Sequence, residues 1–103
     1  MRIPYPHVER AVVVVRPALV LTPRAIGPAG LLIWAAMITN GARTPWPGDL
    51  AIGDWEKIGL LIPSVVRTAK IVAAETTSAT LIGKLKRTDL RQVREKVALH
   101  LGY

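Results

Sequence analysis

Short apolar segments interrupted by proline and glycine constrain the fold of this chain more than any other feature. Residues 18–21 (ALVL) and 31–38 (LLIWAAMI) each have the length and composition of a buried β-strand. Residues 22–30, which join them, contain two prolines and two glycines, a composition typical of a surface loop. The pattern predicts short strands connected by loops, with residues 18–21 as a central strand.

One polar residue borders each of these two segments. Arg16 opens the first and Thr39 closes the second. If the strands pair, a guanidinium and a hydroxyl meet at the end of an otherwise apolar surface, which suits an anion such as a phosphodiester. The competing interpretation is structural: Arg16 pairs with Glu9 or with solvent, and Thr39 only ends a strand. Composition alone favours this structural interpretation.

The remaining segments predict more strands and one helix. Further short strands are expected at residues 3–6, 50–52 and 64–72, with a turn or a single helical turn at 54–57. The alternation within 64–72 is imperfect because Arg67 falls on an otherwise apolar face. Apolar residues recur at helical spacing over 89–101 and predict an amphipathic helix. Together these elements predict a mainly β (α+β) fold, a small curled antiparallel sheet with the helix packed against it.

The composition indicates one domain with an acidic partner. The chain has 103 residues, a net charge of +7 and no cysteine. Nucleic acid, an acidic protein or an anionic membrane surface all suit such a charge, and the clustering of basic residues favours the first two. The lack of cysteine excludes disulfides and thiolate zinc sites. Because no segment is long and apolar enough to span a bilayer, we expect a cytoplasmic protein with no membrane attachment.

Motifs of the common hydrolases are missing. The sequence contains no Gly-x-Ser-x-Gly elbow, no His-Glu-x-x-His motif and no phosphate-binding loop of the Gly-x-x-x-x-Gly-Lys type. His7 and His100 lie near opposite ends of the chain, and a surface or capping role is expected for His100. We expect no metal and no other cofactor. Chemistry through arginine and hydroxyl groups remains, and RNA suits it better than DNA because RNA carries an internal 2′-OH nucleophile.

Several motifs, in order along nearly the whole chain, resemble those of the PemK/MazF family of toxin endoribonucleases. They are IPYP at 3–6, RPALVL at 16–21, AMIT at 36–39, PWPGD at 45–49, PSVVR at 63–67 and the basic, leucine-rich terminal helix. The resemblance implies a small SH3-like barrel of about five to six antiparallel strands with a C-terminal α-helix. It also implies a homodimer that cuts single-stranded RNA at short sequences without a metal, and that is held inactive by an acidic antitoxin.

The resemblance further implies a catalytic pair, which maps onto Arg16 and Thr39, and a serine near the bound RNA, which maps onto Ser64. On the same segment as Ser64, Arg67 and Lys70 are predicted to contact phosphates. Asn40, directly after Thr39, is a further candidate for RNA binding.

Trp46 lies between two prolines in the loop at residues 40–48 and is either a base-stacking platform or a loop anchor. Trp34 and Trp55 are expected in the core or in dimer contacts. The basic residues between Lys84 and Lys96 have three interpretations of equal weight: an RNA backbone contact, a docking surface for the antitoxin, or a solvated helix face.

The chain departs from the family pattern at its N-terminal end. We expect a single domain over residues 1–103 that lacks part of the family's first strand. Residues 10–15 (RAVVVV) occupy the position of a loop that is polar in the family but apolar here. Because of these departures, a second function stays open. In this alternative the chain is a non-catalytic barrel that acts only by binding other proteins, either as a degenerate toxin or as a gyrase-poison-like protein.

Overall fold

The structure, a computed structural model, describes residues 11–14 and 16–103. Its strands are β1 (Ala11–Val14), β2 (Ala18–Val20), β3 (Leu32–Asn40), β4 (Asp49–Ala51), β5 (Ser64–Glu75) and β6 (Thr80–Lys84). Its helices are α1 (Trp55–Ile58) and α2 (Arg87–His100), and short 3₁₀ turns occupy Pro28–Gly30 and Thr76–Ser78. The edge strand predicted at residues 3–6 lies outside the described residues.

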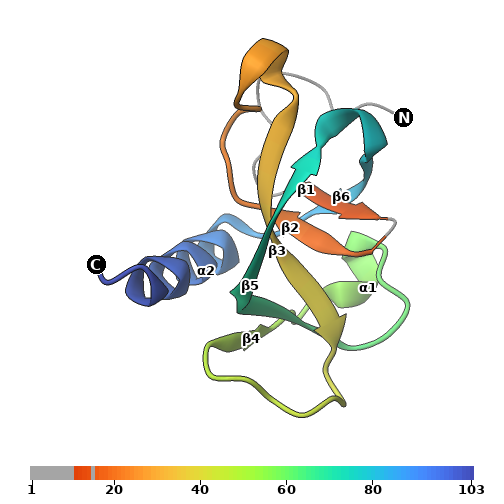
Figure 1. The fold of residues 1–103 in the computed structure, drawn as a ribbon. Coiled ribbons are helices and arrows are strands. Elements are labelled where there is room, and N and C mark those ends of the chain that lie inside the picture. The colour runs from red at the N-terminus through yellow and green to blue at the C-terminus, as the bar shows by residue number, and fades with distance from the viewer. Residues whose placement is uncertain (1–10, 15) are drawn as a thin grey trace.

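All six strands form one antiparallel sheet in the order β4-β5-β3-β2-β1-β6 (Figure 1). The long strands β3 and β5 pair along the whole of β3, with a register shift between Ala36 and Met37. Such an irregularity bends a strand and increases its twist. No pairing joins β4 to β6 among the described residues, so the sheet is a half-barrel. The prediction of a mainly β fold with a C-terminal helix is confirmed.

The prediction of a loop at residues 10–15 is wrong for the part that the structure describes. Residues Ala11–Val14 form strand β1, which pairs with β2 on one side and with β6 on the other. The physical reason is that β-branched valine favours an extended backbone, and that β2 and β6 provide backbone hydrogen-bond partners on both sides of β1. The described valines, residues 12–14, therefore lie within the sheet instead of connecting two strands.

The core lies on both faces of the sheet. On one face, Leu19 of β2 packs with Val93 of α2 in a cluster of ten buried residues. On the other face, the adjacent residue Val20 packs with Ile33 of β3. A strand covered on both faces needs a continuous run of apolar residues, which explains why apolar and polar residues do not alternate in 18–21. No helix in the described part of the chain is long and apolar enough to cross a membrane.

The terminal helix α2 buries its first half more than its second. Leu90 and Val93 are buried against the sheet, and Val97 is partly buried. Leu101, expected on the same apolar stripe, follows the helix and exposes 70% of its surface. The helix thus covers the sheet mainly with its N-terminal turns (Figure 1).

Candidate functional site

The ladder between β2 and β3 places Arg16 and Thr39 at facing positions. Ala18 pairs with Met37, and the ladder continues one step further because Ile38 N donates to Pro17 O at 3.0 Å. The next facing positions in this antiparallel register are Arg16 and Thr39. Arg16 is exposed and Thr39 is partly buried. Their backbones therefore meet at one end of the ladder, as the sequence predicts for paired strands.

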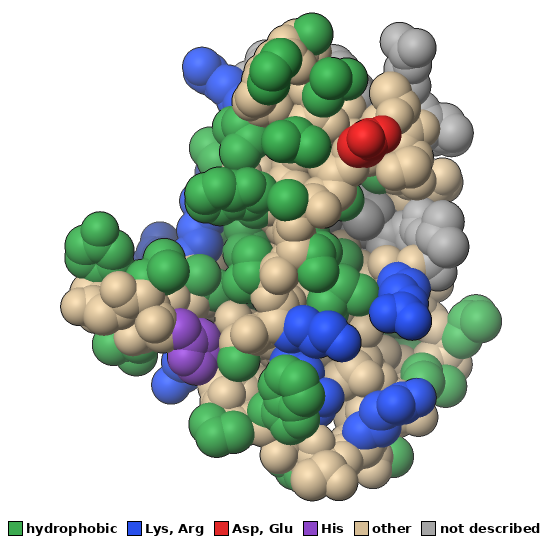
Figure 2. All heavy atoms as spheres, viewed as in Figure 1, with side chains coloured by type: hydrophobic (Ala, Val, Ile, Leu, Met, Phe, Trp, Pro, Cys, Tyr) green, Lys and Arg blue, Asp and Glu red, His purple; other side chains and the backbone are tan. Residues whose placement is uncertain are grey.

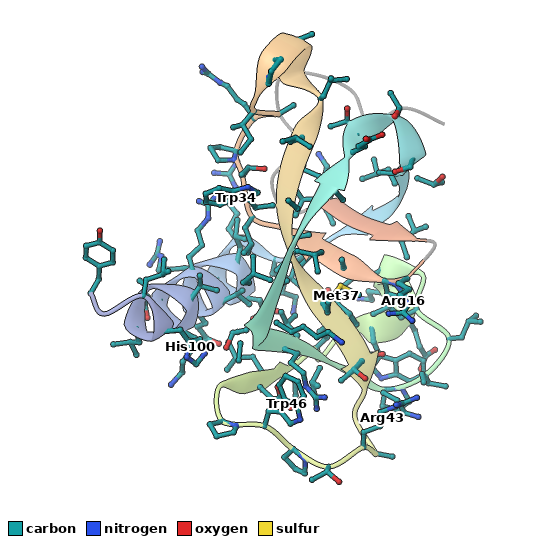
Figure 3. All side chains as sticks on the ribbon, viewed as in Figure 1. Arg16, Trp34, Met37, Arg43, Trp46 and His100 are labelled. Atoms are coloured by element: carbon teal, nitrogen blue, oxygen red, sulfur yellow. The ribbon has the colours of Figure 1, made fainter. Side chains whose placement is uncertain are left out.

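Both residues line one cavity of about 840 Å³. Its wall also includes the ends of β3 and β5, the loop at 41–48 and the segment at 59–62. All seven residues predicted for the site line this cavity: Arg16, Thr39, Asn40, Trp46, Ser64, Arg67 and Lys70. Figure 3 shows four of the lining residues near one another: Arg16, Met37, Arg43 and Trp46. Trp34 and His100 lie away from this group. The fold thus brings together residues from four separate segments, and their roles stay predictions.

The polar part of the cavity wall is basic. Arg16, Arg43, Arg67 and Lys70 line it, and no described lining residue is Asp or Glu. Figure 2 shows Lys and Arg side chains gathered on this face, with acidic side chains only toward the opposite end of the view. Lining residues of one charge sign concentrate the field inside a cleft and attract the opposite charge. The cavity therefore favours an anionic ligand.

Arg43 is a lining residue that the sequence analysis missed. It lies in the loop after β3, four residues beyond Thr39, and is exposed. No strand or helix pattern extends through this loop, so periodicity does not place its side chains. The only feature of the sequence that could have indicated Arg43 is its position, because it is a basic residue in the loop that begins shortly after the candidate residue Thr39.

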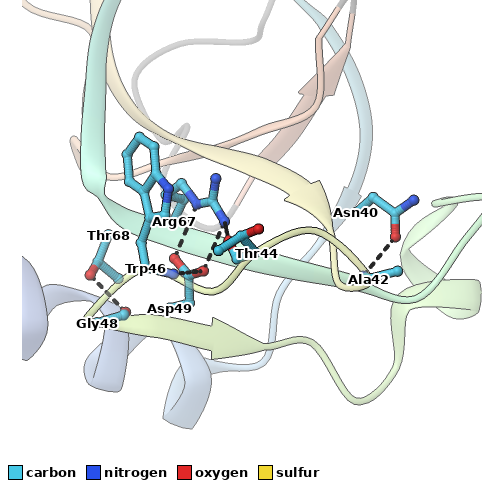
Figure 4. Close-up of polar contacts among 8 residues, drawn as sticks. All are labelled: Asn40, Ala42, Thr44, Trp46, Gly48, Asp49, Arg67 and Thr68. Atoms are coloured by element: carbon cyan, nitrogen blue, oxygen red, sulfur yellow. Dashed lines mark hydrogen bonds and ion pairs between the residues drawn. The ribbon is translucent and has the colours of Figure 1, made fainter.

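The guanidinium of Arg67 is held by the loop beside it (Figure 4). Its Nε donates to Asp49 Oδ1 at 3.2 Å, and its Nη2 donates to Asp49 Oδ2 and to Thr44 O, both at 3.0 Å. The guanidinium carbon also lies 4.2 Å from the centroid of the Trp46 ring. Arg67 exposes only 8% of its surface. Its predicted phosphate contact is thereby restricted to Nη1, and its observed contacts anchor the loop.

Asp49 completes this buried ion pair. Burial raises the pKa of the Asp49 carboxyl. Hydrogen bonds from the Arg67 side chain and from the backbone N–H of Trp46, together with the positive charge of Arg67, lower this pKa by a larger amount. The net pKa is below the ordinary value of 3.8. The carboxylate is therefore charged near neutral pH and pairs with the cation that interrupts the alternation of β5.

Two other predicted residues use part of their hydrogen-bonding capacity locally. Ser64 is buried, and its Oγ donates to Ile62 O at 2.8 Å. Asn40 Oδ1 accepts from Ala42 N at 2.9 Å, an arrangement that stabilises the start of the loop (Figure 4). The Asn40 side-chain NH₂ group takes no part in that bond. Both side chains thus shape the cavity wall as well as lining it.

His100 lies outside the cavity, at the end of α2. Its Nε2 is 3.0 Å from Thr68 Oγ1, so the histidine contacts β5. The expectation of a surface position fits its exposure. No group of three or more His, Cys, Asp or Glu residues in the described part of the chain could hold a metal ion.

A second hollow of about 390 Å³ lies between the sheet and the end of α2. Leu21, Trp34, Val97 and Leu101 contribute to its mostly apolar wall. Trp34 exposes 53% of its surface, so it is not a core residue, and its dimer contact stays a prediction. Trp55, in contrast, is partly buried and packs against the core.

Comparison with known proteins agrees with this fold. A chain of the MazE-MazF crystal structure (Form III) from Deinococcus radiodurans is 26% identical, with a TM-score of 0.75 over 91% of this chain and 94% of that chain. MazF (Form I) from the same organism is 22% identical, with a TM-score of 0.79 over 97% and 100%. An endoribonuclease from a mycobacterial species is 17% identical, with a TM-score of 0.70 over 96% of both chains.

The family assignment rests on nearly the whole sequence. No curated protein matches the chain. A family model described as PemK-like, MazF-like toxin of type II toxin-antitoxin system matches residues 3–101. The protein therefore belongs to the PemK-like, MazF-like toxin family of type II toxin-antitoxin systems.

Proposed function

We propose that this protein is a metal-independent endoribonuclease that cleaves single-stranded RNA in the cavity at the end of the β2–β3 ladder. The observation that carries the proposal is the facing position of Arg16 and Thr39 in a cavity lined by basic side chains. Family membership and the likeness to a mycobacterial endoribonuclease support it. Cleavage of messenger RNA in the cytoplasm would inhibit growth, as expected of a toxin.

In this proposal the RNA supplies its own nucleophile. The 2′-oxygen forms a bond to phosphorus, and the bond from phosphorus to the 5′-oxygen breaks. The 2′-OH proton passes to water, the leaving 5′-oxygen takes a proton from water, and a 2′,3′-cyclic phosphate and a 5′-hydroxyl result. The Arg16 fork donates to the two non-bridging oxygens, which gain charge in the pentacoordinate state. The Thr39 hydroxyl adds a neutral donor, and each such donor contributes on the order of 3 kcal/mol.

The rest of the cavity wall suits binding of the flanking nucleotides. Lys70 and Arg43 provide cations for neighbouring phosphates, and the amide of Asn40 can donate to a base edge. Trp46 exposes 43% of its surface while Arg67 contacts its ring, so it can stack with a base and anchor the loop at once. Ser64 lines the cavity beside them. These groups give the site its preference for short, unpaired sequences.

The proposal includes two protein partners. We expect a homodimer, and the large exposed surface of Trp34 supports an interface between proteins. We also expect an acidic antitoxin, because the chain carries a net charge of +7 and a homologous chain was crystallised as MazE-MazF. An acidic segment suits both the basic cavity and the exposed basic residues of α2, which are Arg87, Arg91, Arg94 and Lys96.

The decisive experiment follows cleavage of an end-labelled single-stranded RNA in EDTA. We expect cleavage at defined sites, a 2′,3′-cyclic phosphate on the product, and no cleavage where the scissile nucleotide carries 2′-deoxyribose. The same sequence as DNA is the control. Intact RNA together with tight binding of the antitoxin or inhibition of gyrase would instead support the non-catalytic barrel.

A further inference from the structure

A chain of hydrogen bonds connects the end of α2 to the loop that forms part of the cavity wall. Thr68 Oγ1 donates to Gly48 O at 2.8 Å and lies 3.0 Å from His100 Nε2. A threonine hydroxyl has a single hydrogen, and here Gly48 O accepts it. His100 Nε2 must therefore carry the hydrogen of the second bond and donate to Thr68.

The backbone at Gly48 fits closely against this pair. Gly48 has φ +88°, and a Cβ at this position would lie 2.7 Å from Thr68 Oγ1 and 2.9 Å from His100 Nε2. A side chain here would therefore displace one of the two groups or the loop itself, and the positive φ also favours glycine. Thr68 is almost fully buried, at 1% exposure. The loop therefore ends in close contact with the side chains of Thr68 and His100.

Two consecutive residues of β5 hold this loop. Thr68 binds Gly48 O, whereas Arg67 binds Asp49 and Thr44 O. Figure 4 shows both sets of contacts reaching the loop from β5. Residues 41–47, in contrast, are all exposed. Because little apolar burial holds the loop, these polar contacts determine its position.

We propose that His100 is a positioning residue for RNA binding: through Thr68 it fixes the loop that carries Arg43 and Trp46 into the cavity. The proposal rests on the proposed endoribonuclease function. Arg16 and Thr39 lie on other segments, so the chemical step is independent of this loop. Removal of the His100 bond therefore weakens RNA binding and leaves the rate of the bound complex nearly unchanged.

The first measurement uses the protein without RNA. Hydrogen exchange at the loop amides of Ala42, Arg43 and Trp46, each of which donates a hydrogen bond, reports local opening. In His100→Ala we expect exchange about three- to tenfold faster, the effect of losing one hydrogen bond. His100→Gln retains a donor and should restore slow exchange, and Leu99→Ala, at an exposed neighbouring position, is the matched control. Unchanged exchange in His100→Ala overturns the proposal.

The second measurement follows RNA cleavage by the same variants. We expect a KM about three- to tenfold higher for His100→Ala with kcat within twofold of the parent, and near-parental values for His100→Gln. A fall in kcat at constant KM, or no change in either, overturns the positioning role. If the parent protein cleaves no RNA while His100→Ala still loosens the loop, the proposed function fails but the structural link stands.

A second pair of variants guards against a folding defect. Thr68→Val removes the hydroxyl at nearly constant volume, and Thr68→Ser keeps it. Because Thr68→Val removes the bonds to both Gly48 O and His100, we expect its loop exchange and its KM to rise at least as much as in His100→Ala, and Thr68→Ser to resemble the parent. The double variant His100→Ala/Thr68→Val should add little to Thr68→Val alone, because the bond between Thr68 and His100 is already lost there. Additive effects would overturn the proposal.

Discussion

Arg67 and Asp49, 18 positions apart in the chain, form two parallel charge-assisted hydrogen bonds of 3.2 and 3.0 Å at the base of the candidate RNA-binding loop. Each side chain exposes only 10% of its surface. The pair explains how a cation that interrupts the apolar alternation of β5 is tolerated inside the protein. It also joins strand β5 to the loop that carries Trp46.

Removal of one partner of this ion pair should destabilise the fold. Asp49→Asn leaves the buried Arg67 guanidinium without its counter-charge, and such changes cost about 3–5 kcal/mol. We expect a loss of this size in the free energy of unfolding, measured by chemical denaturation at neutral pH. Glu56→Gln, at an exposed position of α1, is the control and should change little. An Asp49→Asn protein as stable as the parent would contradict a stabilising ion pair.

The same pair predicts how stability depends on pH. The folded pKa of Asp49 lies below its ordinary value of 3.8, so its carboxylate stabilises the folded state at higher pH. This contribution is complete above about pH 4 to 5 and decreases as the pH falls through 3.8 toward the lower folded pKa. Unfolding experiments across this window should show a steeper acid loss in the parent than in Asp49→Asn. Parallel curves would show that Asp49 makes no contribution.

Arg16→Ala should remove RNA cleavage without unfolding the protein. Arg16 is exposed and lines the cavity, so we expect the cleavage rate to fall about 100- to 1,000-fold while the melting temperature stays constant. Arg16→Lys retains the charge but loses the planar fork and should recover only part of the rate. Arg24→Ala, at an exposed basic position outside the cavity lining, is the matched control. Equal losses for Arg16→Ala and Arg24→Ala would indicate that general charge, not the fork, matters.

Thr39 should act through its hydroxyl and not through its shape. Thr39→Val is nearly isosteric and keeps the β-branched side chain that suits β3, so its fold should be intact. We expect kcat to fall about 100-fold with little change in KM, and Thr39→Ser to keep most of the activity. Single-turnover cleavage assays separate the two constants. If valine works as well as threonine, the hydroxyl takes no part in the reaction.

A glycine in β6 provides a test of the fold itself. A Cβ at Gly83 would collide with the backbone carbonyl of Ile58, at the end of α1, whereas a Cβ at Gly53 meets no atom within 4 Å. Gly83→Ala should therefore destabilise the protein by about 1–3 kcal/mol, as overpacking does. Gly53→Ala should be close to neutral. Equal melting temperatures for the two variants would contradict the close packing of α1 on β6.

Much of the strand framework was predictable from the sequence. Residues 18–21 and 31–38 are apolar runs between proline- and glycine-rich loops, and β2 and β3 form there. The facing positions of Arg16 and Thr39 followed once these two strands were assumed to be neighbours. Residues 10–15 misled the prediction because their expected role came from a family pattern, whereas their valines favour a strand on physical grounds.

The sequence alone determined the short strands, the amphipathic helix and the two polar residues at the strand ends, because these depend on local propensity and on periodicity. Only the tertiary structure decided that Arg43, Lys70 and the segment at 59–62 share one cavity, and that Arg67 faces Asp49 inside the protein. Such relationships depend on which strands pair and where their register shifts. Pairing is set by side chains that lie far apart in the chain and meet only when the sheet curls.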